Sequence, residues 1–163
     1  MVIAAIALML LLIISVILWL DNVSNNSLSQ PQEDTVKSFG YPQQFTVLYL
    51  PQGQDKPVRT EYWYYPQYKM KITFLNGLVY AVEEHQVQNQ SEPTDLKPQD
   101  IDLHTSLAEV EELVGKANYE PVDFLPGFFE AGQLETYISS QALFAYENGS
   151  LTFFQTVELP VNK

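Results

Sequence analysis

FLNGLVY, residues 74–80, places Asn-Gly between two apolar runs. Asn-Gly is the residue pair that most favours a two-residue β-hairpin turn. The chain repeats this arrangement at residues 145–151, which read AYENGSL. Both turns follow segments rich in β-branched and aromatic residues, which favour strands. The sequence therefore predicts two antiparallel hairpins that share one kind of turn.

A short helical pattern precedes each hairpin region. At 105–115, TSLAEVEELVG, Ser106 and Glu109 fit a capping box ahead of an apolar stripe. At 32–42, QEDTVKSFGYP, Gly40 ends a shorter pattern. The sequence therefore predicts an α+β fold with two helix-plus-antiparallel-meander repeats, in which helices back an antiparallel sheet.

The N-terminal run VIAAIALMLLLIISVILWL, residues 2–20, carries no charge. At ~1.5 Å per residue it is long enough for the ~30 Å hydrocarbon core of a bilayer. It predicts an uncleaved transmembrane helix, with a cleaved signal peptide as the alternative. The segment after it has no base before Lys37. We therefore expect a single-pass envelope protein whose C-terminal part lies outside the cytoplasm, in a periplasmic or extracellular location.

Polar stretches and charge divide the rest of the chain. The expected parts are an anchor at 1–20, a polar spacer at 21–33, a first α/β-meander unit at 34–84, a linker at 85–103 and a second unit at 104–159. The chain has 163 residues, no Cys and a net charge of −12. Residues 83–163 hold three bases against fifteen acids, whereas the first unit is mildly basic. Such an acidic chain repels nucleic acid.

The Asn-Gly turn at 76–77 predicts which side chains of the first hairpin face the helix. A two-residue loop pairs Leu75 with Leu78, and side chains then alternate between faces. The expected core face holds Met70, Ile72, Phe74, Val79 and Ala81. The expected open face holds Lys69, Lys71, Thr73, Tyr80 and Val82. A slip of one residue would reverse this assignment.

A second tight turn is predicted at Pro66-Gln67. It would pair Tyr64 with Lys69, Trp63 with Met70 and Tyr62 with Lys71, so that Trp63 joins the core. The predicted protein-binding residues are Tyr62, Tyr64, Lys69, Lys71 and Tyr80. Tyrosines beside lysines suit an acidic segment of a protein partner. The alternative is a solvated face on which tyrosine and lysine side chains merely cover each other.

The helix, the following hairpins and the motif F-x-N-G-x-V resemble the β-lactamase-inhibitor-protein-like fold. They are also similar to small outer-membrane lipoproteins of the barrel-assembly machinery, the SmpA/OmlA group. The similar stretches are 32–42 with 58–84, and 104–117 with 133–158. This chain lacks the lipidated Cys of the lipoproteins and has two units instead of one. The resemblance implies a helix-backed antiparallel sheet whose other face binds a protein, without catalytic residues.

Few residues suit catalysis. In DIDLH, Asp100, Asp102 and His104 would share one side of an extended segment and suit a divalent metal; the alternative is a polar linker that enters a helix cap. No nucleotide-binding loop, zinc signature or serine-hydrolase motif is present. We expect a membrane-anchored protein-binding or scaffold module with no catalytic residue, metal or cofactor. The alternative is an envelope hydrolase or metal-binding protein that uses acidic residues near 100–104.

Overall fold

The computed structural model describes residues 27–52, 55–85, 95–120 and 134–156. Within these residues the α-helices are α2 (Gln30–Phe39) and α3 (Leu107–Val114), and the short 3₁₀ turns are η2 (Pro66–Tyr68) and η3 (Pro98–Asp100). The strands are β1 (Gln44–Gln52), β2 (Asp55–Tyr65), β3 (Met70–Leu75), β4 (Leu78–Glu84), β5 (Asn118–Tyr119), β6 (Glu135–Ile138), β7 (Ala142–Glu147) and β8 (Ser150–Thr156).

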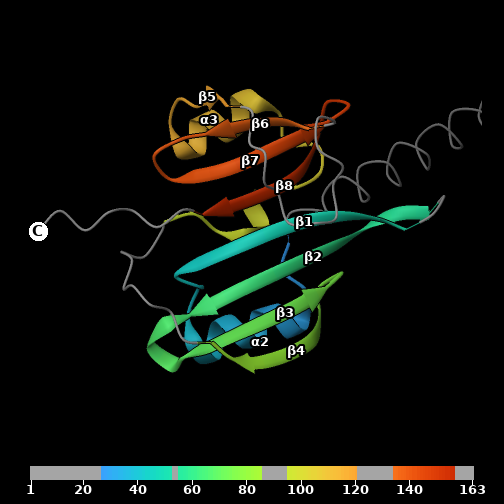
Figure 1. The fold of residues 1–163 in the computed structure, drawn as a ribbon. Helices are drawn as coiled ribbons and strands as arrows, with labels where there is room; N and C mark the ends of the chain where they lie inside the picture. Colours follow the sequence, from blue (N-terminus) through green and yellow to red (C-terminus); the bar gives the residue numbers. More distant parts are fainter. Residues whose placement is uncertain (1–26, 53–54, 86–94, 121–133, 157–163) are drawn as a thin grey trace, which may run out of the picture.

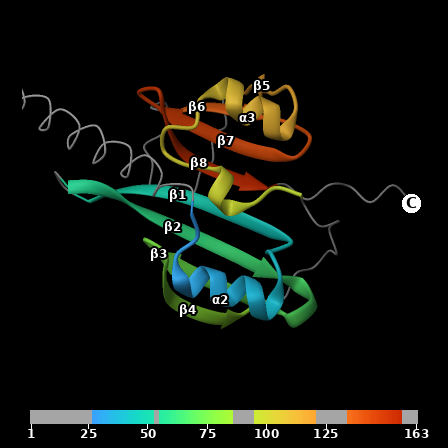
Figure 2. The same cartoon turned by 180° about the vertical axis from the view of Figure 1, so that it is seen from behind.

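All eight strands form one antiparallel sheet in the order β4-β3-β2-β1-β8-β7-β6-β5 (Figure 1). Strands β1 to β4 and strands β5 to β8 are neighbours in sequence, and β1 pairs with β8 at the centre of the sheet. Both helices and η3 lie on the same side of the sheet (Figure 2). We call this side the helix face and the opposite side the open face.

The predicted fold class, an N-terminal transmembrane helix followed by two helix-plus-meander repeats, is wrong. The described residues form mainly one eight-stranded sheet with two helices, because β1 and β8 pair across what we expected to be a boundary between units. Thr46, Val47 and Leu48 of β1 lie opposite Gln155, Phe154 and Phe153 of β8.

The predicted membrane location also requires correction. Neither helix in the described part of the chain is long and apolar enough to cross a membrane. This finding contradicts the prediction of a single-pass membrane protein with its C-terminal part outside the cytoplasm. The transmembrane segment predicted at 1–20 itself lies outside the described residues.

Both Asn-Gly turns are confirmed. Asn76 and Gly77 have φ of 45° and 78°, and Asn148 and Gly149 have φ of 50° and 80°, as a turn with two left-handed residues requires. Leu75 pairs with Leu78 and Phe74 with Val79, as predicted.

A β-bulge follows the first turn and alters the predicted faces of β4. Thr73 pairs with Ala81 instead of Tyr80, and Ile72 pairs with Val82 instead of Ala81. The extra residue in β4 shifts every later side chain to the other face. A corresponding shift follows the second turn, between Ala145 and Tyr146.

The second predicted turn is longer than expected. The connection between β2 and β3 contains η2, and Lys69 closes it in a left-handed conformation with φ of 49°. Trp63 therefore pairs with Ile72 instead of Met70, and Tyr64 pairs with Lys71 instead of Lys69. Because this shift is an even number of residues, Trp63 stays on the core side, as predicted.

Side chains on the helix face form the main core. Trp63, Phe74 and Phe144 are fully buried there, and Val110 and Val114 of α3 pack against the same cluster. A smaller cluster of Leu48, Ala145 and Phe153 lies on the open face. Part of the predicted polar linker is also core, since Leu96 and Ile101 are buried in the main cluster. The core is thus continuous from α2 to α3.

Candidate functional site

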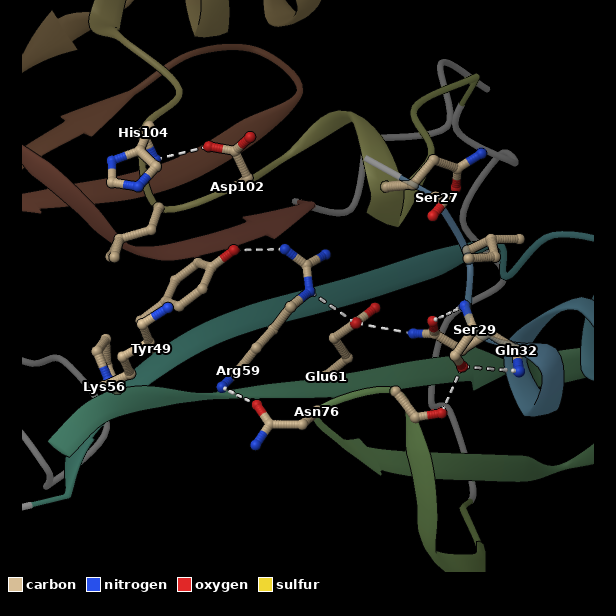
Figure 3. Close-up of a pocket in the computed structure, with 15 residues that line it drawn as sticks. Ser27, Ser29, Gln32, Tyr49, Lys56, Arg59, Glu61, Asn76, Asp102 and His104 are labelled. Atoms are coloured by element: carbon tan, nitrogen blue, oxygen red, sulfur yellow. Dashed lines mark hydrogen bonds and ion pairs between the residues drawn. The ribbon is translucent and has the colours of Figure 1, made fainter. Parts of the chain in front are cut away.

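A pocket of about 610 Å³ opens on the helix face (Figure 3). The start of α2, the segment around η3 and strands β1 and β2 surround it. Its lining is Ser27, Leu28, Ser29, Gln32, Tyr49, Lys56, Pro57, Arg59, Glu61, Asn76, Gly77, Gln99, Asp102, Leu103 and His104. Most of these residues carry a hydroxyl, amide or charged group.

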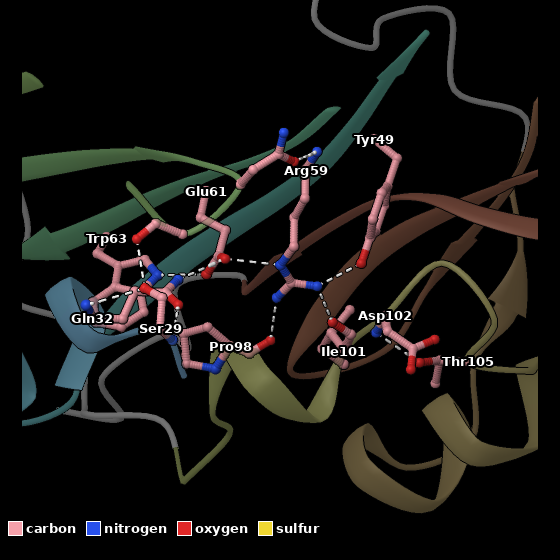
Figure 4. A network of polar contacts seen from close by, with 12 residues as sticks. Ser29, Gln32, Tyr49, Arg59, Glu61, Trp63, Pro98, Ile101, Asp102 and Thr105 are labelled. Atoms are coloured by element: carbon pink, nitrogen blue, oxygen red, sulfur yellow. Dashed lines mark hydrogen bonds and ion pairs between the residues drawn. The ribbon is translucent and has the colours of Figure 1, made fainter. Parts of the chain in front are cut away.

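Arg59 of β2 holds the segment around η3 against the sheet (Figure 4). One terminal nitrogen of its guanidinium donates to the Tyr49 hydroxyl and to the Ile101 carbonyl, each at 2.5 Å. The other terminal nitrogen donates to the Pro98 carbonyl at 2.7 Å. Its Nε donates to Glu61 at 2.8 Å. Arg59 thereby connects β1, β2 and the segment that leads to α3.

Glu61 is buried, with 2% of its side chain exposed, and accepts three hydrogen bonds. Besides Arg59, the donors are Gln32 Nε2 of α2 at 2.8 Å and Trp63 Nε1 at 2.9 Å. A buried carboxylate is tolerated when a cation and hydrogen bonds compensate for its desolvation. Glu61 therefore anchors the first turn of α2 to the sheet.

The electrostatics of this network favour a structural role. Burial alone would lower the pKa of Arg59, but Glu61 and Tyr49 raise it above its ordinary value, so the guanidinium stays charged. Burial raises the pKa of Tyr49 and keeps its hydroxyl protonated. Since Arg59 and Glu61 already bind each other and their neighbours, neither is free to act as an anion receptor or a general base.

The predicted metal alternative at 100–104 is not formed. The Asp102 carboxylate accepts a hydrogen bond from the backbone N–H of His104 at 2.6 Å, and the backbone N–H of Asp102 donates to Thr105 Oγ1 at 2.8 Å. These bonds form a turn that leads into α3. Within the described ranges, no group of three His, Cys, Asp or Glu side chains is arranged to hold a metal ion.

Three of the five predicted docking residues meet on the open face. Tyr62, Tyr64 and Lys71 come from the paired strands β2 and β3 and are each half-buried. Lys71 Nζ lies 5.5 Å from the centre of the Tyr62 ring and 2.8 Å from a carboxylate oxygen of Glu83. The hydrogen bond to Glu83 raises the pKa of Lys71. Lys71 therefore covers Tyr62, as the alternative interpretation of this face expects, and its charge is partly neutralised.

The other two predicted residues lie at the margins of that group. Lys69 is exposed in the turn after η2, and Tyr80 is 72% exposed at the bulge of β4. Tyr64 also contacts the ring of His85, with 5.1 Å between the ring centres. We name Tyr62, Tyr64, Lys69, Lys71 and Tyr80 together the tyrosine–lysine surface. Whether this surface binds a partner stays a prediction.

The Arg59–Glu61 network was not predicted from the sequence, although one signal for it was present. Trp63 was expected in the core, and residues two and four positions earlier in a strand share its face. Two charged residues on a core face must find partners.

Comparison with known proteins gives no match to a family model, a curated protein or a solved structure. The resemblance to β-lactamase-inhibitor-like proteins stays a prediction.

Proposed function

We propose that this chain is a protein-binding module that docks its partner on the tyrosine–lysine surface. The observation that carries the proposal is the one-sided placement of the helices: α2, α3 and η3 all cover the helix face (Figure 2). In the described part of the chain, no helix covers the face that presents Tyr62, Tyr64 and Lys71. The proposed contact area is the β2–β4 end of this face, because Leu48, Ala145 and Phe153 nearer its centre are at most 1% exposed.

The chemistry of this surface suits a protein partner. Tyrosine rings provide large, rigid contact area and carry a hydroxyl that hydrogen-bonds at an interface. The net charge of −12 disfavours nucleic acid. The pocket with its satisfied Arg59–Glu61 pair lies on the other face, so it does not compete with this docking site.

The lysines of the surface determine how strongly the proposed binding depends on salt. Lys71 is paired with Glu83, whereas Lys69 is exposed at the edge of the surface. An acidic segment of the partner would approach Lys69 directly and would compete with Glu83 for Lys71. Binding is therefore expected to depend moderately on salt, with the tyrosine rings supplying most of the contact area.

The experiment compares two charge-reversed proteins in affinity capture from the cells of origin. Lys69→Glu with Lys71→Glu alters the proposed surface, and Lys37→Glu with Lys116→Glu makes the same change in charge on exposed positions elsewhere. We expect the first pair to lose a partner that the wild type and the control pair both retain. Equal capture by all three proteins would contradict the proposal, and circular dichroism checks that each variant is folded.

A further inference from the structure

The edge strand β4 exposes large apolar side chains. Leu78 is 64% exposed, Val79 48%, Tyr80 72% and Val82 59%. The strand has seven residues and contains no Lys, Arg or Pro, which are common protections of a free edge. The opposite edge strand, β5, has only two residues. The chain therefore limits one edge of its sheet by length, whereas β4 has only its bulge and the terminal Glu83 and Glu84 as protection and is otherwise apolar.

The backbone of β4 directs Val79 and Val82 toward the free edge. The two-residue turn makes Leu78 a hydrogen-bonded partner of Leu75, so the N–H and C=O of Val79 point away from β3. At the other end of β4, the backbone N–H of His85 donates to the carbonyl of Lys69, so His85 faces β3. By alternation, the backbone N–H and C=O groups of Glu84 and Val82 point away from β3. The bulge between them permits both valines to share this orientation.

The side chains of the two valines also share a face. Val79 lies opposite Phe74 and Val82 lies opposite Ile72. Phe74 and Ile72 are buried in the main core on the helix face. Val79 and Val82 thus extend that core to the edge of the sheet, where about half or more of each valine remains exposed.

We propose that two copies of this chain pair through their β4 strands, antiparallel and about a twofold axis between Tyr80 and Ala81. In this register Val79 forms a hydrogen-bonded pair with Val82 of the second copy, and Val82 does so with Val79 of the second copy. The four valines form one apolar strip on the helix face, and the two sheets become continuous. The inference concerns the edge of the sheet and does not depend on the proposed open-face docking.

Charge favours this arrangement over its alternatives. The antiparallel register places Glu83 opposite Leu78 of the second copy and Glu84 opposite Gly77, so no carboxylates face each other. A parallel arrangement would set each glutamate beside its own copy, which is unfavourable. A twofold interface is also closed, because it uses the same edge of both copies; among the described strands, it leaves the two-residue β5 strands at the outer edges.

Disulfide trapping tests the register, because the full chain has no natural cysteine. Chains with Val79→Cys and with Val82→Cys are oxidised separately and as a mixture. The paired positions lie ~5.5 Å apart between Cα atoms, within the range for a disulfide. Because of the bulge, Val79 and Val82 lie opposite Phe74 and Ile72, which are only two residues apart in β3. Identical positions are therefore offset by roughly 7 Å along the strand in addition to the ~5 Å between strands, which is beyond the range for a disulfide. We expect at least about tenfold more cross-linked dimer in the mixture than in either variant alone.

Two controls complete the test. Tyr119→Cys, at an exposed position on β5, measures random collision and is expected to stay uncross-linked. Excess wild-type chain should reduce cross-linking in the mixture by competing for the edge. Equal yields from single variants and mixture, a yield no greater than that of Tyr119→Cys, or cross-linking to a different protein would each overturn the proposed self-pairing. None of these outcomes bears on capture by the tyrosine–lysine surface.

Discussion

Glu61 and Glu83 each form an ion pair with an N···O distance of 2.8 Å, but in different surroundings. The Glu61 side chain is 2% exposed and that of Glu83 is 54% exposed. Removal of one partner from a buried pair leaves an uncompensated charge, which costs ~3–5 kcal/mol. An exposed pair contributes only ~0–1 kcal/mol. The same geometry therefore has different consequences at the two positions.

We predict that Glu61→Ala lowers the free energy of unfolding by about 3–5 kcal/mol, because Arg59, Gln32 and Trp63 all lose their acceptor. Glu83→Ala, the matched control, should lower it by no more than about 1 kcal/mol. Chemical denaturation of the three proteins measures both changes. Similar losses for the two variants would show that the network does not anchor α2 and the segment around η3.

Gly77 and Gly149 occupy equivalent turn positions but meet different neighbours. A Cβ atom on Gly77 would lie 2.8 Å from both Cβ and Oγ of Ser29, the residue that caps α2. A Cβ atom on Gly149 would meet no atom within 4 Å. The Ser29 hydroxyl also donates to the Gly77 carbonyl at 2.5 Å. The first turn thus contacts a helix cap and the second does not.

We predict that Gly149→Ala costs about 1–2 kcal/mol, the price of a left-handed alanine. Gly77→Ala should cost about 1 kcal/mol more, because the new methyl group displaces the Ser29 cap. Thermal unfolding of both variants gives the comparison. If the two alanines destabilise equally, the close contact between the turn and α2 is not maintained in solution.

At this scale the sequence predicts individual positions where one local rule applies. Gly77 follows from turn chemistry, and the burial of Trp63 follows from alternation. The network around Glu61 is harder to predict from the sequence, because its donors come from α2 and from two positions of β2. Its last acceptors are backbone carbonyls near η3, which no side-chain pattern identifies.

At the scale of elements, α3 begins with the predicted capping box. The hydroxyl and backbone N–H of Ser106 donate to the Glu109 carboxylate at 2.6 and 2.7 Å. These hydrogen bonds lower the pKa of Glu109, since they favour its charged form. The first turn of α3 is therefore coupled to pH.

We predict that α3 loses this contribution as pH falls. A lowered pKa means that the stabilisation is fully present above the ordinary pKa of a glutamate and disappears as pH falls through the lowered value. NMR titration of the Glu109 carboxyl measures that value, and Ser106→Ala, which removes the hydroxyl but keeps the backbone N–H, should raise the pKa of Glu109 toward the ordinary value. An unchanged titration in the variant would mean that the capping box is not formed in solution.

Local signals also explain which elements sequence analysis placed correctly. Helix termination at Gly40 and Gly115 and the two Asn-Gly turns each require particular residues. All four features are found in the structure. The start of α2 lay in the predicted spacer, because Ser29 and Gln32 form a capping box within a polar composition. The bulges were not predictable, since an extra residue in β4 leaves no change in local composition.

For the whole molecule, the decisive contact is the pairing of β1 with β8. Phe45 of β1 stacks on Phe154 of β8 with 5.7 Å between ring centres, and the Phe45 backbone N–H donates to Thr156 Oγ1 at 3.0 Å. These residues are far apart in sequence, and their pairing depends on the complete fold. Patterns within each half therefore predicted its strands but not the continuous sheet, and the predicted fold class was wrong.

Because the described strands form one sheet with both described helices on the same side, we propose that the tyrosine–lysine surface on the opposite side docks a protein. Site-specific photo-cross-linking tests it with one reactive phenylalanine derivative at Tyr64 or at Tyr68. Tyr64 belongs to the tyrosine–lysine surface, whereas Tyr68 contacts Phe39 of α2 and is 51% exposed. We predict that a discrete protein partner is cross-linked from position 64 and not from position 68. Cross-linking from position 68 alone, or equally from both positions, would contradict the claim.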